Sequence, residues 1–121
     1  MASADEIYVT IKGTGGHGAL PHLCNDTVLA ASQTIVALQQ VKSRLCKPII
    51  PMVLTFGKML ANGSTNVIPD TVQLAGTFRT VDESWRAEAE RAYSTHNHTN
   101  LCSLWLYCRN RTPRRISLRS K

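Results

Sequence analysis

The chain has 121 residues, 43% of them hydrophobic, which suits a single globular domain with a modest core. No apolar run approaches the ~20 residues of a membrane-spanning helix. Residues 1–6 are polar and carry acidic side chains, unlike a secretory signal, so a cytoplasmic location is expected. The net charge of +6 comes entirely from residues 109–121, because residues 1–108 hold eight Lys or Arg and eight Asp or Glu.

The first part of the chain predicts a strand followed by a helix. Residues 6–12 alternate between apolar and polar side chains, which is typical of a half-buried strand. After a glycine-rich loop, Asn25 or Asp26 is a candidate helix cap. Apolar residues then recur every three or four positions through Lys42, which predicts an amphipathic helix packed on a sheet. The residues of that apolar face are Val28, Ala31, Ile35, Leu38 and Val41.

Two more strands and a second helix are predicted further along. Residues 52–59 and 71–80 have the strand pattern, and a bend at residues 68–70 precedes the second of them. Within that strand, one face carries Val72, Leu74 and Phe78, and the other carries Gln73, Thr77 and Arg79. Asp82 and Glu83 suit the start of a helix, because acidic side chains are favoured there by the helix dipole.

A fourth strand is predicted over residues 101–108, which completes the order β-α-β-β-α-β. This order is typical of a ferredoxin-like α+β fold, with a four-stranded antiparallel sheet and two helices on one face. We therefore assign residues 1–108 to one domain and residues 109–121 to a basic tail. The tail is expected to be disordered, with contact to nucleic acid or a membrane surface as the alternative.

The donors that bind metals in other proteins are poorly placed here. His96, His98, Cys102 and Cys108 match no zinc-finger spacing, and no Cys-x-x-Cys pair occurs in the chain. No His-x-Asp motif or Glu-Glu pair is present either. We therefore expect free thiols and no metal ligand from this chain.

His17 is the first candidate for chemistry, because it lies among the small residues of the glycine-rich loop. Such a loop leaves an imidazole unhindered, and an imidazole can donate a hydrogen bond to a developing oxyanion. A histidine on a loop is also common as a plain surface residue, and His22 has the features of a cap or surface residue. The glycine run is not a phosphate-binding loop, since no Gly-Lys-Ser or Gly-Lys-Thr follows it.

Three motifs occur together. They are Gly-Gly-His-Gly-Ala-Leu-Pro-His at residues 15–22, Asn-Val-Ile-Pro-Asp at residues 66–70 and Gly-Thr-Phe-Arg at residues 76–79. Together they resemble the small lid, or dimerisation, domain of the zinc-dependent aminoacylase/carboxypeptidase metallopeptidase family. The resemblance covers residues 2–90 and is greatest to the bacterial N-acyl-amino-acid and hippurate amidohydrolases. After about Arg91 the pattern departs from the family, and either a shifted reading frame or a genuine alternative terminus would explain the departure.

The resemblance implies a role for three residues. His17 would reach into the active site of a partner subunit and stabilise the oxyanion, while Asn66 and Arg79 would hold the substrate, often by its free carboxylate. Without the resemblance, Arg79 is an exposed strand cation beside an acidic residue.

The resemblance also implies what the rest of the enzyme supplies. A separate catalytic domain would bind two zinc or other divalent ions, so this chain would hold no cofactor and be inactive alone. A homodimer and an N-acyl amino acid or peptide substrate follow as expectations.

Two other functions stay open at this point. One is a freestanding dimer module without catalysis. The other is a nucleic-acid-binding module, which the sequence favours less because the strands offer only Tyr8 and Phe78 for stacking on bases.

Overall fold

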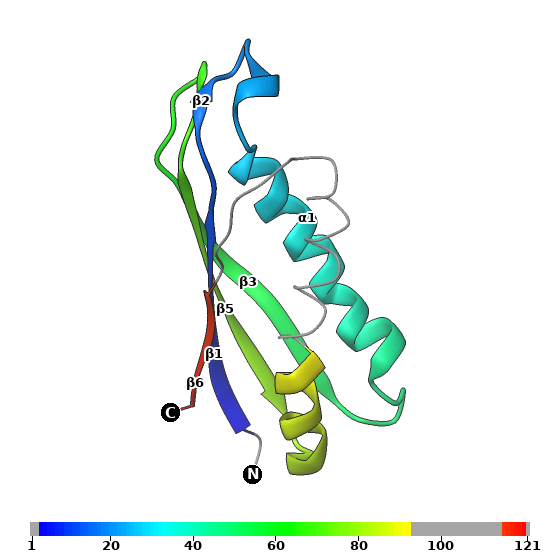
Figure 1. Cartoon of the computed structure of the whole chain (residues 1–121). Helices are drawn as coiled ribbons and strands as arrows, with labels where there is room; N and C mark the ends of the chain where they lie inside the picture. Colours follow the sequence, from blue (N-terminus) through cyan, green and yellow to red (C-terminus); the bar gives the residue numbers. More distant parts are fainter. Residues whose placement is uncertain (1–2, 93–114, 121) are drawn as a thin grey trace.

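A computed structural model of the chain describes residues 3–92 and 115–120 (Figure 1). Within these residues, four antiparallel strands form one sheet in the order β3-β5-β1-β6. Two short strands pair separately at one end of the molecule. The strands of the large sheet are β1 (Ser3–Lys12), β3 (Met52–Ala61), β5 (Thr71–Thr80) and β6 (Arg115–Ser120), and the short pair is β2 (Gly16–His17) with β4 (Val67–Ile68).

Helices cover one face of the large sheet. The short 3-10 helix η1 (Pro21–Leu23) precedes α1 (Thr27–Gln40), which continues as a π-helical turn, η2 (Val41–Leu45). A second helical segment spans residues 83–92 and lies on the same face as α1 (Figure 1). No helix in the described ranges is long and apolar enough to cross a bilayer.

The core lies between the helices and the sheet. The alternating strand residues predicted to be apolar are buried, and β5 has both the bounds and the two faces that the sequence predicts. From the helical side, Leu38 of α1 and Trp85 of the segment 83–92 join the same cluster. The buried strand residues are Ile7, Val9, Ile11, Met52, Leu54, Val72, Leu74 and Phe78.

The predicted apolar face of α1 was wrong at one position. Val28 is 36% exposed, whereas Thr27 and Thr34 are each 2% exposed. The hydroxyl of Thr34 donates to the carbonyl of Ala30 at 2.7 Å, so this polar group is satisfied within the helix. The helix therefore meets the sheet through small residues and threonines as well as through Leu38.

The helix ends follow simple capping rules. Of the two candidate caps for α1, Asp26 is the one used, because its Oδ1 accepts from the backbone N–H of Leu29 at 2.8 Å. Asp82 caps the segment 83–92 in the same way, because its Oδ1 accepts from the backbone N–H of Trp85. A hydrogen bond from the Ser84 hydroxyl and the one from Trp85 lower the pKa of the Asp82 carboxyl. Both helices thus begin at an aspartate at the end of a loop.

The fourth strand of the described sheet comes from residues 115–120. The predicted strand at residues 101–108 lies outside the described residues. Residues 115–120, within the tail expected to be disordered, form β6 next to β1. The sequence Arg-Ile-Ser-Leu-Arg-Ser alternates, and its register sets Ile116 beside Val9 and Leu118 beside Ile7. The mixed α/β fold with an antiparallel sheet is clear, and the ferredoxin-like order of the whole chain stays a prediction.

Candidate functional site

The short β2–β4 pair brings the two conspicuous motifs together. His17 of β2 is paired with Val67 of β4, and the N–H of Gly18 donates to the carbonyl of Asn66 at 2.8 Å. Both His17 and Asn66 are exposed at this end of the molecule. We call this end, residues 13–20 with residues 63–70, the tip. The sequence did not predict β2 or β4, because two residues are too short to show a period.

The imidazole of His17 has a defined orientation. The backbone N–H of Ala19 donates to its Nδ1 at 3.1 Å. In the neutral ring, Nδ1 is then the acceptor and Nε2 carries the proton. Because Nδ1 already accepts a hydrogen bond from its own loop, Nε2 is the ring nitrogen that can donate to another molecule.

Asn66 is oriented in a similar way. The hydroxyl of Ser64 donates to Asn66 Oδ1 at 3.1 Å, so the side-chain NH2 group is left as a donor. The tip therefore presents two N–H donors, one from His17 and one from Asn66. An N–H donor of this kind is suited to an oxygen atom that carries or develops negative charge.

A groove lies beside Asn66. Its volume is about 490 Å³, and its walls include Gly18, Val28, Asn66 and Pro69. It runs between the tip and the start of α1, so an elongated ligand that contacts Asn66 has room beside it.

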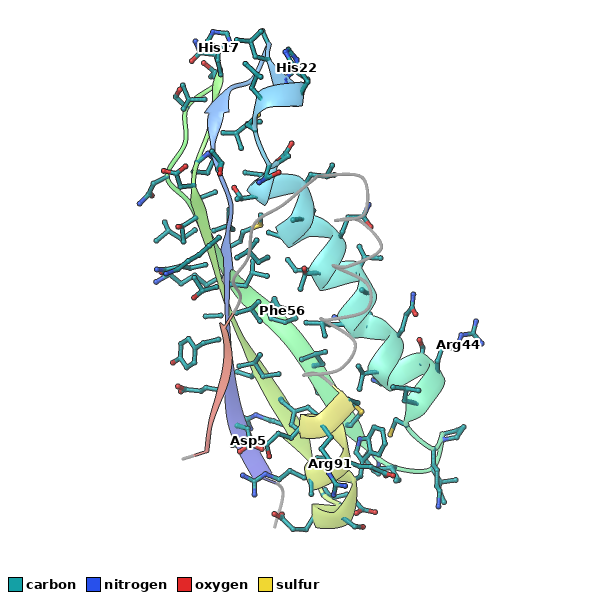
Figure 2. The ribbon with its side chains drawn as sticks, viewed as in Figure 1. Asp5, His17, His22, Arg44, Phe56 and Arg91 are labelled. Atoms are coloured by element: carbon teal, nitrogen blue, oxygen red, sulfur yellow. The ribbon has the colours of Figure 1, made fainter. Side chains whose placement is uncertain are left out.

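Arg79 lies far from the other two predicted site residues. It is the ninth residue of β5, so about eight strand residues, or roughly 27 Å, separate it from the tip end of that strand. Its neighbours across the sheet are Ala4 and Val53. Figure 2 marks the two ends, with His17 at one and Asp5, which pairs with the residue before Arg79, at the other.

The Arg79 side chain is exposed on the sheet face opposite the helices, the face expected for it. Within the described ranges, no acidic side chain pairs with it, so the interpretation as a surface ion pair gains no support. One copy of the chain therefore brings His17 and Asn66 together and leaves Arg79 apart. His22 lies exposed on η1, as a surface residue would.

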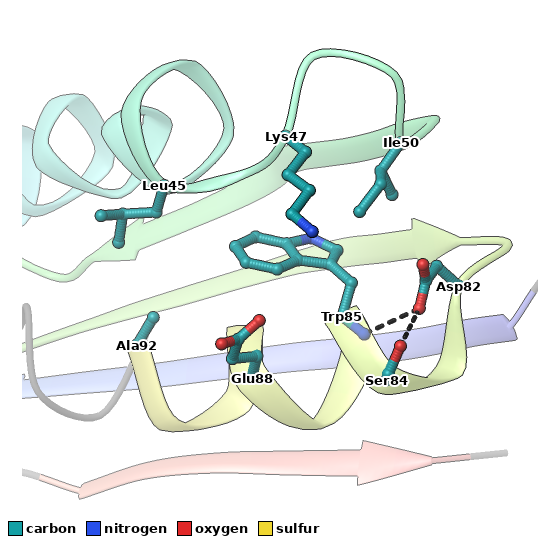
Figure 3. Close-up of a pocket in the computed structure, with 8 residues that line it drawn as sticks. All are labelled: Leu45, Lys47, Ile50, Asp82, Ser84, Trp85, Glu88 and Ala92. Atoms are coloured by element: carbon teal, nitrogen blue, oxygen red, sulfur yellow. Dashed lines mark hydrogen bonds between the residues drawn. The ribbon is translucent and has the colours of Figure 1, made fainter.

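A second pocket, of about 380 Å³, lies between η2 and the helical segment 83–92 (Figure 3). The Trp85 indole N–H beside it donates to the sulfur of Met52 at 3.2 Å, and the Asp82 carboxylate is engaged at the helix start. Arg86 nearby forms a two-pronged ion pair with the buried Asp5, with both contacts at 2.7 Å. These polar groups are already paired with other groups of the domain, so this pocket is a weaker candidate for a functional site than the tip.

Metal binding finds no support in the described ranges, where no three His, Cys, Asp or Glu side chains gather into a possible metal site. Cys24 and Cys46 are free and buried, and burial raises the pKa of the Cys46 thiol. The cluster considered at residues 96–108 lies outside the described residues.

Comparison with known families decides the identity. The model of the peptidase dimerisation domain, of the M20 family, matches residues 3–100. The chain belongs to this family. The resemblance inferred from the three motifs is therefore confirmed for most of the chain.

Relatives of this dimerisation domain are hydrolases. It is 44% identical over 93 residues to the N-acetyl-L-cysteine deacetylase of Bacillus subtilis, covering 77% of this chain and 22% of that enzyme. It is 40% identical over 86 residues to an N-acyl-L-amino acid amidohydrolase of Geobacillus stearothermophilus, covering 71% of this chain and 23% of the other. The chain thus spans less than a quarter of the length of these curated relatives.

Solved structures show the same fold. A protein of methicillin-resistant Staphylococcus aureus described as an aminohydrolase has a TM-score of 0.83 and 27% identity, over 98% of this chain and 30% of that one. A tripeptidase of Staphylococcus aureus has a TM-score of 0.76 at 17% identity, over 98% of this chain and 29% of that one, and this likeness concerns the fold alone.

Proposed function

We propose that the chain is the lid and dimerisation domain of a metal-dependent amidohydrolase, acting on N-acyl amino acids or peptide amides. The observation that carries the proposal is the tip, where His17 and Asn66 each present an oriented N–H donor and a groove lies beside Asn66. In amide hydrolysis the attacked carbonyl oxygen gains negative charge, and prepositioned N–H donors stabilise it. His17 is the residue we assign to that oxygen, with Asn66 holding the substrate.

Arg79 binds the substrate carboxylate in this proposal. A guanidinium group binds a carboxylate through two parallel hydrogen bonds, and Arg79 is exposed without an ion-pair partner in the described ranges. Because Arg79 is at the opposite end of β5 from the tip, a single small substrate does not reach both ends of one lid. Arg79 and His17 of the same copy would thus serve two different active sites.

A homodimer gives each active site a complete set of residues. β1 begins and β6 ends at the Arg79 end, since Asp5 is paired with Ser120, so links to a catalytic domain would leave from that end. Arg79 would then serve the active site of its own subunit, and the tip would reach the site of the partner. In the described sheet β3 pairs only with β5, and it offers its free edge for joining a second lid.

The metal would be held elsewhere in the enzyme. The described residues do not form a donor set for it, so the catalytic domain would supply two zinc or other divalent ions and the attacking water. The lid contributes binding and charge stabilisation, and it excludes water when it closes. We expect no hydrolysis by this chain alone.

A segment exchange tests the proposal. The lid segment of the Bacillus subtilis deacetylase is replaced by the matching part of this chain, and hydrolysis of N-acetyl-L-cysteine is measured with the oligomeric state. We expect the chimera to be a dimer and to hydrolyse the substrate, while the 121-residue chain with added Zn²⁺ or Co²⁺ does not. Turnover by the chain alone, or a folded dimeric chimera without activity, would contradict the proposal.

A further inference from the structure

Asp70 contacts the His17 loop twice, from a position 53 residues later in the sequence. Its Oδ1 accepts from the backbone N–H of Gly15 at 2.7 Å. Its backbone carbonyl accepts from the N–H of Gly13 at 2.8 Å. One residue at the end of the Asn-Val-Ile-Pro-Asp motif therefore holds the loop on both sides of Thr14.

The loop lies directly against the turn that carries Asp70. A Cβ added to Gly15 would be 2.2 Å from the carbonyl oxygen of Ile68, a separation at which something must shift. Only glycine allows the Gly15 N–H to approach the carboxylate so closely without moving the turn. The contact is therefore specific to the pairing of these two motifs.

The turn itself is anchored to the core. The hydroxyl of Thr27, at the start of α1, donates to the carbonyl of Pro69 at 2.5 Å, and Thr27 is buried. The backbone next to Asp70 is therefore held in place. His17, in contrast, is exposed, and its strand β2 has only two residues. The carboxylate links the anchored turn to the exposed loop.

We propose that Asp70 is a positioning residue for His17: its carboxylate fixes the loop so that the Ala19 N–H reaches Nδ1 and Nε2 is left to donate. Asp70 does not contact the substrate in this role, because its oxygen is directed at the Gly15 amide. The catalytic consequence rests on the function proposed above, but the positioning itself is a property of this chain.

Nuclear magnetic resonance of the full 121-residue chain tests the positioning directly. In the wild-type chain we expect the ring nitrogens of His17 to report the neutral form protonated at Nε2, and the Gly15 amide proton to be shifted downfield by the carboxylate. In Asp70→Ala, the Gly15 signal moves upfield and the His17 ring becomes a mixture of the two neutral forms. Asp70→Asn keeps an acceptor oxygen and retains part of both signals.

Asp26→Asn is the matched control, since Asp26 also accepts one backbone N–H, from Leu29, but does not hold the loop. We expect its His17 and Gly15 signals to equal those of the wild type. Unchanged signals in a folded Asp70→Ala chain would overturn the proposal. So would equal changes in the Asp26→Asn control.

The chimera adds a catalytic readout. Misplacing a catalytic group by about 1 Å can cost ~100-fold, so Asp70→Ala is expected to lower kcat by up to about 100-fold, with KM little changed and partial recovery in Asp70→Asn. A rise in KM at constant kcat would contradict the positioning role. An unmutated chimera without activity would instead count against the proposed function, and the resonance test of Asp70 would be unaffected.

Discussion

Replacing His17 by alanine in the chimeric enzyme is expected to lower kcat by about 100- to 1,000-fold, the usual cost of removing one donor to an oxyanion. In the neutral ring of His17 the proton is on Nε2, because Nδ1 accepts from the Ala19 N–H. KM should change little, since the hydrogen bond strengthens mainly as the negative charge develops. The measurement is steady-state hydrolysis of N-acetyl-L-cysteine over a range of substrate concentrations.

His22→Ala is the control for this prediction. His22 is the other histidine of the same motif, is exposed at the same end of the molecule, and accepts no backbone N–H in the described structure (Figure 2). We expect its kcat and KM to match those of the parent chimera. A His17→Ala enzyme that keeps its kcat, or an equal loss in both variants, would remove His17 from the proposed mechanism.

Replacing Leu38 by alanine is expected to lower the free energy of unfolding by about 2–5 kcal/mol. Leu38 is 0% exposed and belongs to the cluster that joins α1 to the sheet. Domains are stable by only about 5–15 kcal/mol, so this one truncation removes a large share. The measurement is urea unfolding of the 121-residue chain, followed by circular dichroism.

The Leu38→Ala change should also weaken the attachment of the tip, because the hydroxyl of Thr27 at the start of α1 donates to the carbonyl of Pro69.

Leu23→Ala is the control, because it makes the same truncation at a residue that is 68% exposed. We expect it to lower the free energy of unfolding by less than about 0.5 kcal/mol. Similar losses in the two variants would mean that α1 does not pack on the sheet as described.

The sequence predicted the large elements well because their side chains alternate or repeat over many residues. The strand at residues 71–80 was predicted with its bounds and both faces, because apolar and polar residues alternate along it. Thr34 was missed as a core residue, because hydropathy does not show that its hydroxyl is satisfied inside the helix. Residues 115–120 were assigned to a disordered tail because residues 109–121 hold basic residues and no acidic one.

The sequence offered candidate site residues but not their arrangement in space. His17, Asn66 and Arg79 were identified from motifs, and the sequence treated them as contributors to one kind of site. The contact between Asp70 and Gly15 spans 55 residues and leaves no local pattern. The separation of Arg79 from the tip follows from the length of β5, and it becomes evident only when β2 and β4 are seen to pair at one end.

The central claim is that His17 and Arg79 of one lid serve two different active sites of a dimer. Subunit mixing tests it most directly, using a His17→Ala chimera and an Arg79→Ala chimera that are each inactive at low substrate concentration. In a hybrid dimer, one active site receives two mutant residues and the other receives two intact ones.

With equal amounts of the two variants, about half of the dimers are hybrids with one complete site each, so mixing should restore about a quarter of the parent activity. If His17 and Arg79 of the same copy acted on a single site, every site would lack one residue. Mixing would then restore nothing, and the account would be contradicted.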